Sequence, residues 1–103
     1  MKQTNPEKLF VCLVKERHDK TSEDIYKATS EEHRRYVTDL WQRGILWAGG
    51  PSTYPSAGIE IYAVDSVEEA IKVQRNAPLY VKGVIYDDKY FEWHPKLLPS
   101  LGK

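Results

Sequence analysis

The most apolar stretch of the chain is residues 8–14, KLFVCLV. Its length and composition are typical of a β-strand. Successive side chains of a strand point to opposite faces, and here both faces are apolar: Leu9, Val11 and Leu13 on one, Phe10, Cys12 and Val14 on the other. A strand with one solvated face alternates apolar and polar residues instead. We therefore expect both faces of this strand to be covered.

A second pattern, of helical period, covers residues 30–43. Its apolar residues recur at spacings of three and four, as in an amphipathic helix; they are Tyr36, Val37, Leu40 and Trp41. His33 lies three residues before Tyr36 and four before Val37, so it shares the apolar face. The pattern predicts a helix that presents one histidine to its packing partner.

The two ends of this helix carry their own signals. Thr29 and Glu32 have the spacing of a capping box, with Ser30 as the alternative N-cap. Gly44 suits the position just after the last turn, where glycine is favoured. Residues 15–28 are polar and highly charged, and they predict a loop with one helical turn near residues 22–27.

The second half of the chain alternates short apolar runs with turn residues. These runs predict strands at residues 45–48, 58–64 and 83–92, with a loop at 49–58 that is rich in glycine and proline. A second helix is expected at residues 66–75, because Ser66 and Glu69 repeat the capping-box spacing. The sequence at 76–78, Asn-Ala-Pro, ends it. Residues 1–7 form a polar tail, and residues 93–103 an extended, partly apolar one.

The order of these elements is β-α-β-β-α-β. With right-handed crossovers this order gives an α+β fold of the ferredoxin-like type, in which two helices cover one face of a four-stranded antiparallel sheet. We expect residues 1–103 to form this one domain. An uncovered apolar sheet face is unusual on a monomer, so the pattern predicts a homodimer whose sheets pack face to face. The alternative is that the tail at 93–103 folds back over the sheet.

Composition narrows the classes of partner. Fifteen basic and fifteen acidic residues give a formal net charge of zero, which argues against nucleic acid or an anionic membrane as a partner. No stretch approaches the ~20 apolar residues of a membrane span, and the N-terminal residues lack the apolar core of a secretory signal. Cys12 is the one cysteine of the sequence, so no disulfide framework is possible. We expect a cytoplasmic protein.

His33 is the residue from which chemistry is expected. In the first turn of the predicted helix, both the helix dipole and partial burial would favour the neutral imidazole that a general base needs. The structural alternative, a histidine that simply packs in the core, stays open. His18 and His94 have no ligand-like spacing with His33, so no metal site is predicted.

Three segments of the chain resemble the YCII-related family of the dimeric α+β barrel superfamily. They are EEHRRYVTDL around His33, then RGILWAGGP, and PLYVKGVIY after the second predicted helix. Together they span about residues 30–65 and 76–86. The family's proposed active site is a His–Asp dyad. The histidine corresponds to His33, but Ala77 stands at the aspartate position.

The resemblance implies an enzyme of small-molecule catabolism that needs no cofactor. Its expected reaction is the elimination of HCl from a chlorinated hydroxyquinol or lactone, or the isomerisation of a similar ring. His33 would be the general base. Asn76, or an acid such as Asp87, would orient it in place of the missing aspartate, although an amide does not stabilise imidazolium as a carboxylate does.

A flat, mostly apolar pocket would hold such a ring. Trp47, Tyr62 and Tyr80 are its expected walls, and the backbone N–H groups of the turn Gly49-Gly50-Pro51 would receive an oxyanion or a chloride. The alternative, from a different functional class, is a non-catalytic homodimer that binds a small metabolite. The missing aspartate favours this alternative.

Overall fold

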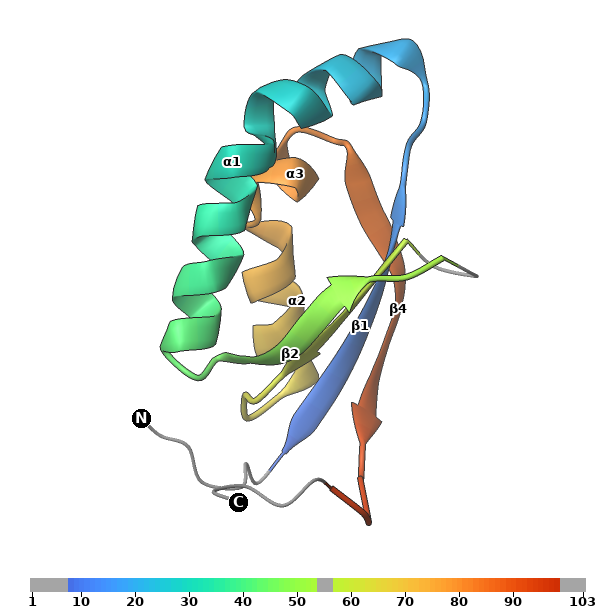
Figure 1. Ribbon diagram of the computed structural model, residues 1–103. Helices are drawn as coiled ribbons and strands as arrows, with labels where there is room; N and C mark the ends of the chain where they lie inside the picture. The colour runs from blue at the N-terminus through green and yellow to red at the C-terminus, as the bar shows by residue number, and fades with distance from the viewer. Residues whose placement is uncertain (1–7, 54–56, 99–103) are drawn as a thin grey trace.

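The computed structural model describes residues 8–53 and 57–98. Their elements are β1 Leu9–Glu16, α1 Lys20–Gln42, β2 Leu46–Pro51, β3 Gly58–Tyr62, α2 Val67–Arg75, α3 Pro78–Val81 and β4 Ile85–Trp93. The four strands form one antiparallel sheet in the order β2-β3-β1-β4, and the helices lie together on one side of it (Figure 1). The predicted ferredoxin-like α+β fold is confirmed. The expectations for residues 1–7, 54–56 and 99–103 lie outside the described residues.

The central strand β1 is apolar on both faces and buried on both. On the helix side, Phe10, Cys12 and Val14 form the main core with Leu40 of α1, Leu46 of β2, Tyr62 of β3 and Ala70 of α2. On the other side, Leu9 and Val11 are also buried. We call the side of the sheet away from the helices the open face. The strands on either side of β1 still expose apolar side chains there, including Ile59 of β3 and Phe91 of β4.

The helix α1 begins ten residues earlier than predicted, at Lys20 rather than at residue 30. Its N-cap is Asp19, whose carboxylate accepts hydrogen bonds from Ser22 N at 2.8 Å and Ser22 Oγ at 3.1 Å. The predicted loop at 15–28 is therefore wrong after Asp19, and so are the predicted caps at Thr29 and Ser30. The sequence pattern missed this part because its inward positions include buried polar residues, Ser22 and Thr29, in place of an apolar stripe.

This correction moves His33 from the first turn into the middle of α1, thirteen residues after Lys20. The field of a helix dipole falls off within the first turn. The helix dipole therefore does not explain a neutral His33. Burial of the side chain is the cause that applies instead. The end of the helix is as predicted: Arg43 is the C-cap, and Gly44 follows with φ at 79°, in the left-handed region that glycine adopts freely.

Gly49, Gly50 and Pro51 form the end of β2 rather than a turn. They pair with Glu60, Ile59 and Gly58 of β3. Because β2 is an edge strand, it tolerates both glycine and proline, which would weaken a central strand. The expected anion-binding turn is therefore absent at these three residues.

The connection from α2 to β4 contains a short helix that the sequence did not indicate. Ser66 caps α2 as predicted, accepting from Glu69 N at 3.2 Å. The break after α2 is also confirmed, but Pro78 then starts α3, a single turn with proline in its favoured first position. Among the described residues, no helix is long and apolar enough to cross a membrane.

Candidate functional site

His33 lies where α1 meets α3. Its side chain is half-buried, and its Nδ1 accepts a hydrogen bond from the backbone N–H of Leu79 at 3.3 Å. Leu79 is in the first turn of α3, where backbone N–H groups have no partner within the helix. The N-cap of α3 is Ala77, whose methyl side chain cannot accept a hydrogen bond from these N–H groups. His33 therefore caps α3 from a different helix.

This contact also determines which nitrogen of the imidazole carries the proton. Burial lowers the pKa of His33 below its ordinary value, so the ring is neutral at neutral pH. A neutral imidazole has one N–H, and a nitrogen that accepts a hydrogen bond leaves the proton on the other. With Nδ1 facing Leu79 N–H, the proton is on Nε2. In this arrangement Nε2–H of His33 is a hydrogen-bond donor.

The residues expected to orient His33 are engaged elsewhere. Asn76 donates from Nδ2 to Lys72 O at 3.0 Å, and so caps the end of its own helix. Ala77 is buried. Asp87 accepts from Tyr80 Oη at 3.1 Å, from Arg75 Nε at 3.0 Å and from Tyr90 Oη. None of these hydrogen bonds reaches the imidazole.

Asp87 is the best-satisfied carboxylate of the described chain. It joins three elements, because Arg75 belongs to α2, Tyr80 to α3 and Tyr90 to β4 itself. Burial opposes its ionisation, yet the hydrogen bonds from Tyr90, Arg75 and Tyr80 hold the pKa of Asp87 below its ordinary value. Asp87 therefore ties the helix layer to the sheet.

The predicted pocket walls do not come together. Trp47 meets Trp93 edge to face, with ring centroids 6.3 Å apart. Tyr62 is buried in the core, and its hydroxyl donates to Gln74 Oε1 at 2.8 Å. Tyr80 binds Asp87 and is sequence neighbour to Leu79, the partner of His33. Of the three aromatic residues, the structure brings Tyr80 alone to the element that His33 contacts.

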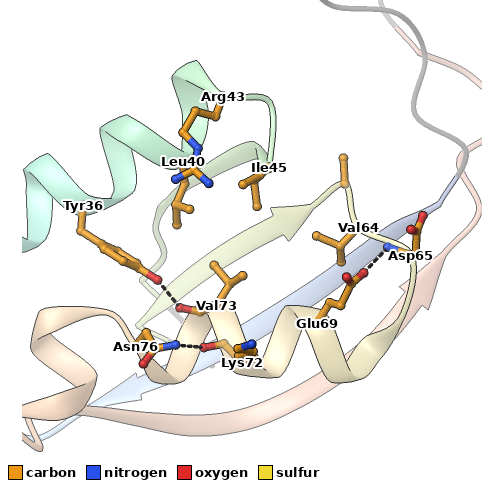
Figure 2. Close-up of a pocket in the computed structure, with 11 residues that line it drawn as sticks. Tyr36, Leu40, Arg43, Ile45, Val64, Asp65, Glu69, Lys72, Val73 and Asn76 are labelled. Atoms are coloured by element: carbon orange, nitrogen blue, oxygen red, sulfur yellow. Dashed lines mark hydrogen bonds between the residues drawn. The ribbon is translucent and has the colours of Figure 1, made fainter.

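A groove of about 530 Å³ runs between α1 and α2, on the side of Tyr36 and Val73 (Figure 2). Tyr36 bridges it by donating from its hydroxyl to Val73 O at 2.8 Å. Asn76 lines the groove, but its amide points to Lys72 rather than into a shared site with His33. The groove therefore does not unite the predicted site residues.

Glu60 is a titratable residue that the sequence reasoning did not single out. It pairs directly with Cys12 of β1, and residues opposite each other in a sheet share a face. Since Cys12 is a core residue, Glu60 also faces the helices. Burial raises the pKa of Glu60 from 4.5 to about 7. The signal in the sequence was weak, because a glutamate in an alternating strand normally faces water.

No group of three or more His, Cys, Asp or Glu side chains in the described chain is placed to hold a metal ion. Cys12 is buried, and desolvation raises the pKa of its thiol to about 12. A thiol of this kind is not a ready nucleophile or metal ligand. The groups left for chemistry are thus the neutral imidazole of His33 and the carboxyl group of Glu60.

The sheet order and the helix layer define a small α+β protein of the ferredoxin-like class. Within that class the chain belongs to the family of the YCII-related domain, whose model matches residues 8–94. Among solved structures it is similar to a 5-chloro-2-hydroxyhydroquinone dehydrochlorinase from Burkholderia phenoliruptrix AC1100, in complex with 2,5-dihydroxybenzoquinone. The TM-score is 0.62 at 18% sequence identity, covering 85% of this chain and 93% of the other. No curated protein sequence gives a significant match.

Proposed function

We propose that this protein is a lyase that eliminates HCl from a small chlorinated hydroxyquinol or a related lactone. The observation that carries the proposal is the half-buried, neutral His33 held against α3, at the position of the family's histidine. The similarity in fold to a dehydrochlorinase supports the reaction class. The elimination removes one proton and one chloride from the ring, so it needs no external oxidant or reductant.

The proposed role of His33 follows from its hydrogen bond. The sequence suggested a general base, which would need a proton on Nδ1 and a free lone pair on Nε2. The bond from Leu79 N–H favours the opposite tautomer. We therefore assign His33 to donate from Nε2–H to a ring oxygen, whose negative charge grows as its proton leaves.

A homodimer through the open face of the sheet is part of the proposal. Ile59 and Phe91 are 38% and 44% exposed on this face, and a second copy would cover them. Two copies of one surface form a closed, two-fold interface. Each subunit then keeps its own helix layer, with His33, on the outside of the paired sheets.

Chloride release from a chlorinated hydroxyquinol tests the proposal. Wild type should turn it over, and His33→Ala should lose activity by about 10²–10³-fold, as when an oxyanion donor is removed. His18→Ala is the matched control, because His18 is a fully solvated histidine before α1. The absence of turnover by a well-folded wild-type protein would contradict the lyase.

A non-catalytic binding protein is the second candidate. Ala77 in place of the dyad aspartate, together with the engaged Nδ1 of His33, favours it. A binder should hold 2,5-dihydroxybenzoquinone, weakened by His33→Ala, without releasing chloride from any chlorinated hydroxyquinol. Saturable binding of the quinone with no turnover would select this function.

A further inference from the structure

We propose that Glu60 is the acid–base residue of this protein, and that it moves protons to and from a ring bound between the helices and the sheet. The inference rests on the proposed lyase function and completes it, because His33 in its present tautomer does not accept a proton from a ligand. Glu60 comes from β3, on the opposite side of the interior from α1.

Glycines flank Glu60 in the sheet. Its partners across the sheet are Gly49 on β2 and Cys12 on β1, and Gly58 lies two residues before it on the same face. A Cβ atom built at Gly58 would lie 3.4 Å from Glu60 Oε2, and one at Gly49 would lie 3.5 Å from Glu60 Cγ. Neither glycine places a side chain over the carboxyl group of Glu60, and the backbone of Gly49 is exposed at the edge of the sheet.

The Glu60 carboxyl group also differs in its contacts from a structural carboxylate. Its Oε1 is shielded from water and meets no hydrogen-bond donor among the described residues. Leaving a buried polar atom unpaired costs free energy. Asp87 shows how this fold holds a carboxylate for structural purposes, with donors from Arg75, Tyr80 and Tyr90. No such donor reaches Oε1 of Glu60 from the described residues, as expected of an atom whose partner is a ligand.

The titratable groups on the elements around Glu60 set its electrostatic environment. The sheet contributes Cys12 from β1, Tyr62 from β3 itself, and Tyr90 and Asp87 from β4; α1 contributes Tyr36, which packs against the core, and His33, which contacts α3. The core residue of α2 nearest Tyr62 is Gln74, which is uncharged. None of these groups is a fixed cation, so the carboxylate gains little from its surroundings. Burial therefore prevails and raises the pKa of Glu60 to about 7.

A carboxyl group with that pKa both takes and returns a proton at neutral pH. In the first step Glu60 takes the proton of one ring hydroxyl and returns it to the ring carbon that bears chlorine. In the second step it takes the proton of another hydroxyl, whose electrons form a C=O bond, and the C–Cl bond breaks with its pair on chloride. The ring has then lost HCl and become a quinone, and Glu60 passes the proton to water.

The test uses Glu60→Gln, which keeps the size of the side chain but does not titrate. Carboxyl carbons of the full chain are followed by NMR across pH. Wild type should show one glutamate titrating near pH 7, and Glu60→Gln should lack it. The matched control is Glu68→Gln, which changes an exposed glutamate of α2 and should keep that titration.

Turnover gives the second readout. Glu60→Gln should lower chloride release by about 10²–10⁴-fold, and Glu60→Asp should restore part of the pH dependence that the glutamine variant loses. Undiminished turnover in Glu60→Gln, or a wild-type spectrum with every glutamate in the ordinary range, would overturn the assignment. If wild type releases no chloride, the lyase proposal fails, while the NMR titration still decides the state of Glu60.

Discussion

At the scale of single residues, burial acts on His33 and Glu60 in opposite directions. Removing a group from water disfavours its charged form, so the pKa of the imidazole falls and that of the carboxyl group rises. Burial therefore shifts both side chains toward their neutral forms. Their effects on stability have opposite signs along the pH axis, which allows each to be measured separately.

His33 should make the fold more sensitive to acid. Its pKa is lowered by burial in the folded protein, below the ordinary 6.5, so the unfolded chain binds this proton more readily. The stability it contributes is present above pH 6.5 and is lost as the pH falls toward the folded pKa. The free energy of unfolding measured in urea should therefore fall below that pH more steeply for wild type than for His33→Gln. The glutamine keeps an acceptor for Leu79 N–H, and equal slopes for the two proteins would contradict the prediction.

Glu60 should have the reverse effect. Its pKa of about 7 in the folded protein lies above the ordinary 4.5, so the folded protein holds this proton more tightly. Stability is then fullest below pH 4.5 and declines as the pH rises to about 7. Glu60→Gln removes the decline. The unfolding free energy of this variant should therefore exceed that of wild type by an amount that grows with pH, to at most ~3 kcal/mol. A gain that is the same in acid and at about pH 8 would contradict it.

The two residues also differ in how far the sequence could identify them. His33 stood out because a histidine on an apolar helix face is uncommon, and the family resemblance pointed to it. Its tautomer depends on Leu79, forty-six residues later, which no local pattern reports. Glu60 alternates with Ile59 and Ile61 as a solvated strand residue would. That it faces the helices follows from its pairing with Cys12, and register is a property of the assembled sheet.

At the scale of elements, the early start of α1 depends on a single cap. Asp19 accepts two hydrogen bonds from Ser22, and these lower the pKa of its carboxyl group. Asp19→Ala should lower Tm and fray the first turns of α1, which amide hydrogen exchange over residues 20–28 would show. Glu32→Gln, at the rejected capping position, should leave both unchanged. A larger loss of Tm in Glu32→Gln than in Asp19→Ala would restore the later helix start.

The element pattern was predictable wherever one face of an element is apolar. The strands β1, β3 and β4, the helix α2 and the end of α1 follow directly from such runs and from Ser66 and Gly44. The errors have a common physical cause. The beginning of α1 is held by its Asp19 cap, and the single turn of α3 by His33 from the middle of α1; neither is held by a local apolar stripe. Gly49 and Gly50 have turn chemistry, but pairing with β3 overrides it.

At the scale of the whole molecule, the proposed homodimer rests on the apolar residues of the open face of the sheet. Phe91 and Ile59 remain 44% and 38% exposed on it, beside buried Val11. The tail proposed as an alternative cover leaves Leu97 almost fully exposed in its described part. A second copy of the chain is thus the better cover, because an isologous contact buries the same apolar residues twice.

Charge placed on this face should separate the subunits. Phe91→Glu would have to bury a carboxylate without a partner in the dimer, and we expect at least a tenfold weaker association, equivalent to about 1.4 kcal/mol. Sedimentation at several concentrations measures it. Val81→Glu is the matched control, since Val81 is 65% exposed but belongs to α3 on the helix side.

Truncation after Trp93 distinguishes a dimer formed by the sheet from one formed by the tail. A chain that still dimerises without its tail owes the dimer to the sheet, and one that becomes monomeric owes it to the tail. Because Glu60 faces the helices and not the open face, Phe91→Glu should separate the subunits while the titration of Glu60 near pH 7 persists in the monomer.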